Sequence, residues 1–338
     1  MTAFGELLAA WVLQDFGFAA HSVEEMNHGA DDAAQLWRVV SDVGAAYAVK
    51  LSGGGTAAGL VVSMQLANGG VDGIPSPILT RDERLFSERD GRRLSVVPWV
   101  SNHRALDGGM HAAHWAAFGS VLAQVHAAEV TDELIRILPR EDHTHEGPAL
   151  AVVDLNRRLG VAETDRTEVG VPDDELADEL MYRWRVASGR VSTLVTRADR
   201  LGQELRRSTA RPVVCHGDPH LGNLLLDAPK RVWLIDWDDV VLAPRERDLM
   251  FVVDGVLAFA PVTAQERAWF FDGYGAVDLD ARRLAYYQCV RALLDLVDPA
   301  AAVIDGRRPR SERVDALEIV EGVLSPTGLV DIALRHSG

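Results

Sequence analysis

The residues whose types and spacing could do chemistry lie in one stretch of the last third of the chain, residues 215–239. Asp218 lies in a polar loop, and Asn223 follows it five positions later (223 − 218). Asp236 comes directly after the apolar run 232–235. Phosphoryl transfer requires a carboxylate that accepts a proton, together with a carboxamide oxygen and a further carboxylate for a hard cation. The pattern therefore indicates phosphoryl-transfer chemistry.

Three apolar runs must position these side chains. Residues 211–215, 224–226 and 232–235 are short apolar segments separated by polar turns. Such runs predict a strand that enters a loop, followed by a short hairpin. Asp236 is expected just past the second strand of that hairpin.

The first part of the chain predicts a helix followed by an antiparallel meander. Residues 3–16 place apolar side chains at helical spacing. Residues 21–26, 35–41 and 45–51 are strand-like and are separated by turn-forming residues. Lys50 stands at the end of the third predicted strand.

Two segments near this meander are candidates for a nucleotide-binding loop. Residues 52–56, Ser-Gly-Gly-Gly-Thr, lack the Gly-Lys-Ser/Thr ending of a P-loop, and we interpret them as a glycine-rich connector. Residues 27–32 lie between the first two strands and are the better candidate for covering a nucleotide, although they contain a single glycine.

The chain then changes from strands to helices. A helix is predicted over 57–66, and two strands over 79–86 and 93–100 with a turn at Asp90-Gly91. The next predicted helix carries Trp115 and ends near Ala128. Further helices are predicted over 149–159, 174–185 and 191–206. From 246 to the end the pattern stays helical, with boundaries at Pro261, Pro299 and Pro326.

This order predicts an α+β protein with two lobes. Residues 1–97 form a small antiparallel-β lobe and residues 110–338 a larger, mainly helical lobe. The polar, turn-rich residues 98–109 between them are the expected hinge. A chain of 338 residues is long enough for two such bodies.

The charge of the chain restricts its partners. Asp and Glu number 50 against 34 Lys and Arg, which gives a formal net charge of −16. This balance argues against nucleic acid or an anionic membrane surface as partners, because both attract basic patches. It suits a cationic small molecule. The acidic residues between Glu163 and Glu179 are either a solvated face or an acidic wall for a polyamine substrate.

The remaining composition favours a soluble, cytoplasmic protein. Glu6 and Asp15 interrupt the apolar positions at the start, so a signal peptide is not expected. No uncharged apolar segment is long enough to span a bilayer. Two cysteines are too few for a disulfide framework or a cysteine zinc site.

Taken together, the motifs resemble those of the aminoglycoside phosphotransferase family, which has a two-lobed, protein-kinase-like fold. The resemblance covers the whole chain in order. It is carried by His216-Gly217-Asp218 with Asn223, by Ile235-Asp236 and by Ala48-Val49-Lys50. The spectinomycin phosphotransferase branch is the most similar, on the evidence of Asp236-Trp237-Asp238, of 242–251 (Leu-Ala-Pro-Arg-Glu-Arg-Asp-Leu-Met-Phe), of Tyr274-Gly275 and of Tyr286-Tyr287.

The resemblance implies a role for each motif residue. Asp218 would be the catalytic residue that accepts the proton of the substrate hydroxyl, and Lys50 would pair with the phosphates of ATP or GTP. Asn223 and Asp236 would hold Mg²⁺. The adenine would lie alongside the end of the last strand of the small lobe, at Val97, Trp99 and Val100.

The roles of three further residues each have two possible interpretations. Asp238 and Asp239 either face an amine of the substrate or lie in solvent. His216 could brace its loop rather than react, since this mechanism needs no imidazole. The implied reaction transfers the γ-phosphate to a hydroxyl of an aminoglycoside or aminocyclitol antibiotic, with a spectinomycin-like acceptor favoured. Its role would be antibiotic resistance, with a metabolic role as the alternative.

One position departs from the family. Its members usually place a glutamate on the helix after the lysine strand, where it fixes that lysine. Residues 56–67 contain no acid. Either another carboxylate, such as that of Asp236, holds Lys50, or nucleotide affinity is weak.

Other functions stay open at this point. The acceptor could be another small metabolite of the choline, homoserine, sugar or macrolide type. A metal-dependent phosphohydrolase could use His216-x-Asp218-x-His220 as ligands, because alternating residues of an extended segment point to one side. The departure at residues 56–67 would also suit a kinase-like binding module without turnover.

Overall fold

Five antiparallel strands form a sheet at the N-terminal end of the computed structural model, which describes residues 2–26, 34–54, 56–161 and 171–335. In β2, alternate side chains such as those of Trp37 and Val39 are buried, which is the period of a strand with one covered face. The predicted meander is confirmed. The sheet order is β1 (Ala20–Met26), β2 (Ala34–Ser41), β3 (Ala46–Ser52), β5 (Arg92–Pro98) and β4 (Ser87–Arg89).

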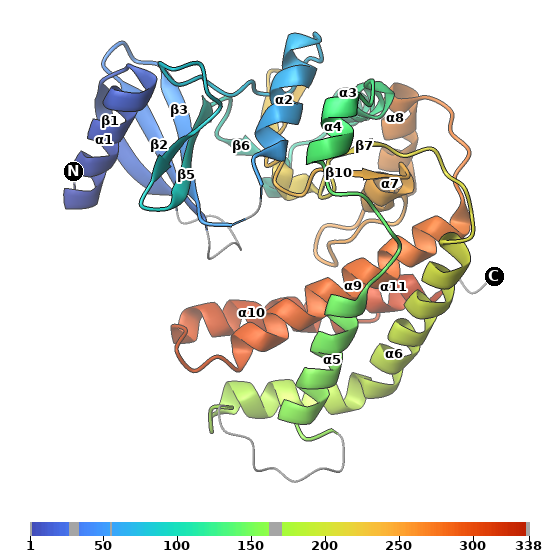
Figure 1. The fold of residues 1–338 in the computed structure, drawn as a ribbon. Helices are drawn as coiled ribbons and strands as arrows, with labels where there is room; N and C mark the ends of the chain where they lie inside the picture. Colours follow the sequence, from blue (N-terminus) through green and yellow to red (C-terminus); the bar gives the residue numbers. More distant parts are fainter. Residues whose placement is uncertain (1, 27–33, 55, 162–170, 336–338) are drawn as a thin grey trace. The chain divides into compact units, whose positions relative to one another are not determined.

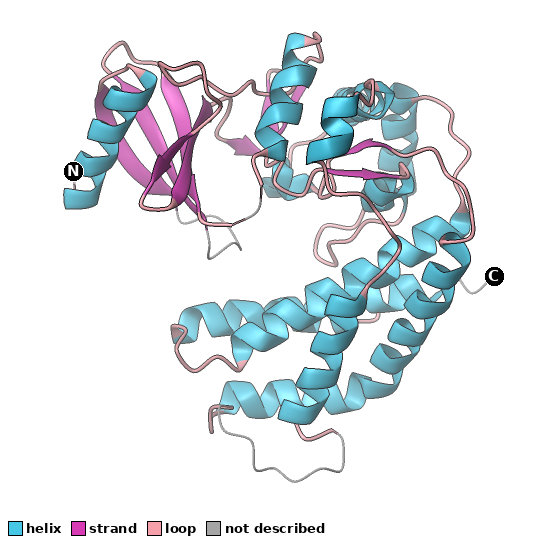
Figure 2. Cartoon of the chain, viewed as in Figure 1, coloured by secondary structure: helices cyan, strands magenta, loops and turns pink. Residues whose placement is uncertain are grey.

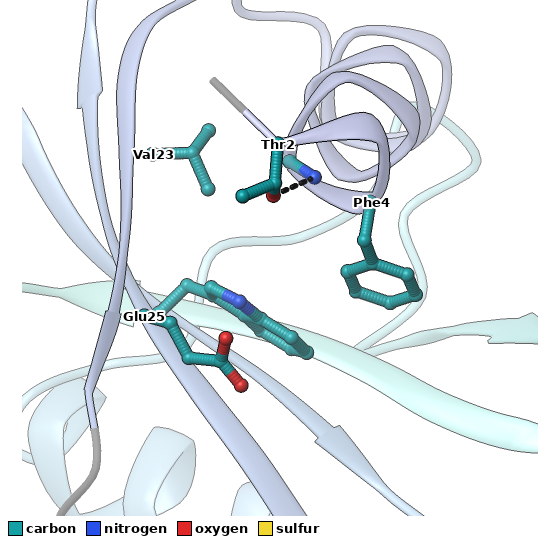
Figure 3. A pocket seen from close by; sticks show the side chains of 6 residues that line it. Thr2, Phe4, Val23 and Glu25 are labelled. Carbon is teal, nitrogen blue, oxygen red and sulfur yellow. Dashed lines mark hydrogen bonds between the residues drawn. The ribbon is translucent and has the colours of Figure 1, made fainter.

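Helix α1 (Ala3–Phe16) covers this sheet, as Figure 1 shows. The hydroxyl of Thr2 caps the helix by accepting a hydrogen bond from the Gly5 amide at 3.1 Å. Leu8 and Val12 are fully buried in a core that includes the inner residues of β2, β3 and β5. Figure 3 shows a hollow beside the start of the helix. Its lining residues are Thr2, Phe4, Gly5, Val23, Glu25 and Trp37.

The predicted strand over 79–86 is wrong. The structure has a loop there, and the pairing with β5 is limited to β4. The loop closes on itself, because the Arg84 amide donates to the Thr80 hydroxyl and the Thr80 amide donates to the Arg84 carbonyl oxygen. Glu83 has a φ of 59°, which a strand does not accommodate. The predicted helix over 57–66 is confirmed as α2 (Ala58–Asn68).

Two small sheets flank the polar loop, and one of them contains the predicted hairpin. Strands β8 (Leu224–Asp227) and β9 (Arg231–Leu234) are its two arms, and β6 (His103–Arg104) pairs with β8. Strand β7 (Val213–Cys215) precedes the polar loop and pairs with β10 (Val241–Ala243). The loop of residues 216–223 is therefore held between β7 and β8.

The chain forms two compact units. Unit 1 contains Met1–Pro139, Val213–Leu242 and Gln265–Ala276, and unit 2 contains Arg140–Pro212, Ala243–Ala264 and Val277–Gly338. The two units are divided at other residues than the predicted hinge, 98–109. The predicted lobe boundaries therefore stay a prediction. The helices of unit 1 are α1, α2, α3 (Ala112–Ala127), α4 (Asp132–Ile137) and most of α8 (Ala264–Tyr274).

Unit 2 consists of helices joined by loops (Figure 2). The helices are α5 (Glu146–Arg158), α6 (Glu175–Leu205), α7 (Glu246–Val253), α9 (Ala281–Val303), α10 (Arg310–Leu324) and α11 (Leu329–Arg335). Their apolar faces share one core. In the described residues, no helix is both long and apolar enough to cross a membrane.

Two helix boundaries differ from the prediction. The segments 174–185 and 191–206 are one continuous helix, α6. Ala187 is buried between them, and this packing offsets the cost of about 1 kcal/mol for a glycine such as Gly189 inside a helix. Pro299 lies inside α9 rather than at its end. The neighbouring Leu296 and Ala300 are fully buried, so packing also offsets the hydrogen bond that the proline removes.

The start of α6 depends on Asp174, which lies in the acidic segment noted in the sequence. Its Oδ1 accepts hydrogen bonds from the Leu176 and Ala177 amides, both at 3.1 Å. Its Oδ2 lies 2.7 Å from the buried guanidinium of Arg313. The hydrogen bond from Arg313, helped by those of the helix amides, lowers the pKa of Asp174 to about 2.

We expect Asp174→Ala to lower the free energy of unfolding by about 2 kcal/mol at pH 7, through loss of the helix cap and of the partner of a buried arginine. Because the folded-state pKa is lower than the ordinary 3.8, the carboxylate's contribution is full above pH 3.8 and disappears as the pH falls towards about 2. Urea unfolding at several pH values measures this difference. The exposed neighbour provides the control, Asp173→Ala, whose effect should be small.

Candidate active site

The loop between β7 and β8 depends on one glycine. Gly217 has a φ of 89°, a conformation that side chains rarely adopt. A Cβ atom there would lie 2.1 Å from the carbonyl oxygen of Asp239. Residue 217 must therefore be glycine for the loop to lie against the segment that follows β9.

His216 stabilises this loop through hydrogen bonds to the backbone. Its side chain is fully buried, and its Nε2 lies 2.9 Å from the carbonyl oxygen of Ile235. Its Nδ1 accepts from the Asp218 amide at 3.3 Å. Because a carbonyl only accepts and an amide only donates, the proton lies on Nε2. His216 thus joins the loop to the end of β9, as one of its two interpretations predicted.

Asp218 and Asn223 are brought together by backbone bonds. The Asn223 Nδ2 donates to the Asp218 carbonyl oxygen at 2.9 Å, so the amide oxygen of Asn223 points away from this bond. The Asp218 carboxylate is 17% exposed. The Nε2 of His220 lies 3.4 Å from its Oδ2, while the Nδ1 of His220 accepts from the Gly222 amide.

Asp236 follows β9 with a φ of 62°. The preceding residue, Ile235, donates its amide to the Asn223 carbonyl oxygen at 3.0 Å. This bond places the backbones of residues 223 and 235 side by side, next to Asp236. The three residues that the sequence singled out for proton acceptance and metal binding therefore belong to one braced substructure of unit 1.

Lys50 contacts two carboxylates of the same segment. Its Nζ lies 3.0 Å from Asp236 Oδ1 and 2.7 Å from Asp238 Oδ2. Burial alone lowers the pKa of Lys50, but the negative charges of Asp236 and Asp238 outweigh it and raise the pKa above its ordinary value. The expectation that another carboxylate holds this lysine is confirmed for Asp236. The contact with Asp238 was not anticipated.

The predicted adenine neighbours lie where β5 ends. Val97 pairs with Ala48 of β3, and the Trp99 amide donates to the Ala46 carbonyl oxygen at 2.9 Å. Val97, Trp99 and Val100 are all partly exposed, and their contact with a nucleotide stays a prediction. The proposed nucleotide-covering loop 27–32 lies outside the described residues, and so does the part of the acidic segment from 163 to 170.

A family model described as "Phosphotransferase enzyme family" matches residues 60–293. The chain belongs to this family. It is therefore a small-molecule phosphotransferase, and the predicted fold class is confirmed. A comparison with curated proteins gives no match.

Solved structures show the same fold. Spectinomycin phosphotransferase APH(9)-Ia in complex with ADP and spectinomycin is 24% identical, with a TM-score of 0.84 over 98% of each chain. Its AMP-bound complex gives a TM-score of 0.82 at 23% identity over 99% of each chain. Amicoumacin kinase hAmiN in complex with AMP-PNP, Ca²⁺ and Ami is 14% identical, with a TM-score of 0.58 over 97% of this chain and 96% of the other.

The geometry of the phosphotransferase argues against the hydrolase alternative. Both ring nitrogens of His216 are engaged with backbone groups, which leaves no lone pair for a metal ion. Within the described part of the chain, His216, Asp218 and His220 do not form a group with converging ligand atoms. The alternation of residues in this short motif was misleading, because the loop is curved rather than extended.

Sequence reasoning missed the close approach of α2 to the residues after β9. A Cβ atom on Gly59 would lie 2.2 Å from the carbonyl oxygen of Trp237. The pattern gave no signal for this contact, since a glycine inside a helix has several causes. The α2 helix therefore supports the backbone between Asp236 and Asp238.

We expect Gly59→Ala to lower the free energy of unfolding by about 2 kcal/mol, because a fixed backbone carbonyl cannot yield to the new methyl group. The matched control is Gly189→Ala in α6, where an added Cβ meets nothing within 4 Å. There the better helix propensity of alanine should raise the stability by up to about 1 kcal/mol. Urea unfolding of both variants tests the opposite signs, and equal effects would contradict the contact at Trp237.

Proposed function

We propose that the protein transfers the γ-phosphate of ATP, with Mg²⁺, to a hydroxyl of an aminoglycoside or aminocyclitol, with a spectinomycin-like acceptor favoured. The observation that carries the proposal is the position of Lys50. The ammonium group of Lys50, the proposed phosphate ligand, lies 3.0 Å from Asp236, in the same unit as Asp218 and Asn223. Cation, proton acceptor and oxygen ligands are the parts of a phosphoryl-transfer site.

Asp218 is the proposed proton acceptor. Its carboxylate would take a hydrogen bond from the substrate hydroxyl and aim its oxygen at the phosphorus atom. Much of the benefit of such a group comes from holding the nucleophile in line. The braced loop around His216 supports this role, because it fixes the backbone on which Asp218 stands.

Lys50 is the proposed nucleotide ligand. An ammonium group serves phosphate as a compact point charge with three donors. The raised pKa keeps Lys50 protonated throughout the physiological range. On nucleotide binding, the phosphate oxygens would share this ammonium group with the carboxylates that now contact it.

The donor set after the loop fits Mg²⁺. Asn223 uses its Nδ2 on the backbone and keeps an amide oxygen, and Asp236 offers a carboxylate that is 48% exposed. Magnesium prefers oxygen ligands, takes few from the protein and completes its shell with water and phosphate oxygens. The ion, when bound, neutralises charge on the phosphates.

The acceptor class follows from charge and from the relatives. A net charge of −16 favours a cationic acceptor by attraction at long range. Asp239 is exposed beside Gly217 and is the proposed contact for an amine of the acceptor. Spectinomycin is named in the complex of a structure with the same fold, which supports it as the first acceptor to test. A cytoplasmic location and a role in antibiotic resistance are part of this proposal.

An acceptor panel tests the proposal. The protein is incubated with ATP and Mg²⁺ and with spectinomycin, kanamycin, a macrolide, choline or homoserine, and ADP release is followed by a coupled assay. We expect ADP release that depends on the acceptor and is fastest with spectinomycin. Dependence on another acceptor would overturn the substrate assignment. If no acceptor increased ADP release while ADP still bound, the protein would be a kinase-like binding module without turnover.

A further inference from the structure

The helix that follows the lysine strand offers no partner for Lys50. Helix α2 has the sequence AGLVVSMQLAN, which contains no acidic residue. Its one long polar side chain, Gln65, reaches Glu133 at 3.5 Å instead. In the described part of the chain, the carboxylates that form ion pairs with Lys50 are those of Asp236 and Asp238.

Trp237 separates these two carboxylates and is itself firmly held. It is 6% exposed, and its Nε1 donates to the Leu234 carbonyl oxygen at 3.1 Å. Its ring meets that of His216 edge to face, with centroids 4.6 Å apart. Its backbone is the one against which Gly59 of α2 packs. With Trp237 anchored by ring and backbone, Asp236 and Asp238 are both set on the side of Lys50.

We propose that Asp238 is the positioning residue that holds Lys50 for the nucleotide, which leaves Asp236 for the metal ion. This inference rests on the proposed function. Helix α2 then acts indirectly, because it supports the segment that provides the carboxylate rather than providing one itself. Asp238 makes the shorter contact, 2.7 Å against 3.0 Å for Asp236.

The division between the two carboxylates follows from charge. If Asp236 held Mg²⁺, its carboxylate would face the ion and would contribute less negative charge to Lys50. Asp238 then remains as the carboxylate that orients the ammonium group. The sequence allows Asp238 as a contact for the acceptor, but in the structure its Oδ2 accepts a hydrogen bond from Lys50.

The test measures nucleotide binding and needs no turnover. ADP is titrated into the Asp238→Asn variant by calorimetry, with Mg²⁺ and with EDTA. We expect the affinity for ADP to fall about tenfold with Mg²⁺, which is the lower end of the range for a charged hydrogen bond because Asp238 is 52% exposed. The loss should be smaller in EDTA, where Asp236 still contacts Lys50. Asp238→Glu, which keeps the charge, should recover most of the loss. The control is Asp72→Asn, which removes an exposed carboxylate paired with Arg231 and should bind ADP normally.

A double-mutant cycle shows whether Asp238 acts through the lysine. In the Lys50→Met background, Asp238→Asn should change ADP affinity little, because the group it positions is gone. Additive losses in the cycle would overturn the proposal. So would normal ADP affinity of Asp238→Asn together with a raised KM for the acceptor, since that result makes Asp238 an acceptor contact. Failure of every acceptor in the turnover assay would instead overturn the proposed function and leave these binding results valid.

Discussion

Asp218→Asn is expected to lower kcat for acceptor-dependent ADP release by about 10³-fold, because the amide cannot accept the hydroxyl proton. The substitution preserves size and shape. The hydrogen bond from Asn223 uses the backbone carbonyl oxygen of residue 218, so it survives the change. ADP affinity should therefore stay within about twofold of the unchanged protein, since the lost group acts on the acceptor side.

Steady-state kinetics with the best acceptor and calorimetry with ADP measure the two quantities separately. Asp227→Asn is the matched control, because this carboxylate ends β8 in the same hairpin and contacts the Trp233 Nε1 at 3.5 Å. It should retain near-normal turnover. If Asp218→Asn also retained it, Asp218 could not be the proton acceptor, and the proposed mechanism would fail.

Local sequence spacing predicted where the candidate residues of the loop lie in the fold. Asp218, Asn223 and Asp236 stand in one short segment, and the strands on either side are themselves short apolar runs. Their relative placement therefore follows largely from the hairpin and from the loop that precedes it. The same holds for the meander around Lys50, where alternation of buried and exposed side chains is a local property.

The partner of Lys50 could not be predicted in the same way. Asp236 and Asp238 lie 186 and 188 residues further along the chain, and no periodicity links such positions. The contact is tertiary, and it lies beside another tertiary contact that gave no sequence signal, the packing of Gly59 of α2 on Trp237. Tertiary packing also decided the wrong predictions, since buried side chains continue α6 and α9 through residues that usually break helices.

Asp236→Asn is expected to shift the Mg²⁺ requirement of ADP release to higher concentration and to lower kcat/KM for ATP at limiting Mg²⁺ by about 10²-fold or more. The variant loses the charged oxygen of the proposed metal site. Asparagine tolerates a positive φ, so the backbone at 62° should be kept. Asp236→Ala would add backbone strain and would confuse a loss of stability with a loss of metal binding.

The affinity for ADP, measured in EDTA and with Mg²⁺, distinguishes the role of Asp236 from that of Asp238. Asp238 still contacts Lys50 in the Asp236→Asn variant, so metal-free ADP binding should change by less than about threefold. Asp238→Asn should show another pattern, with ADP binding weakened mainly when Mg²⁺ is present and an unchanged Mg²⁺ requirement of ADP release. Two carboxylates that contact one ammonium group are then told apart by what each variant loses. An identical Mg²⁺ profile for Asp236→Asn and the unchanged protein would remove Asp236 from the proposed metal site.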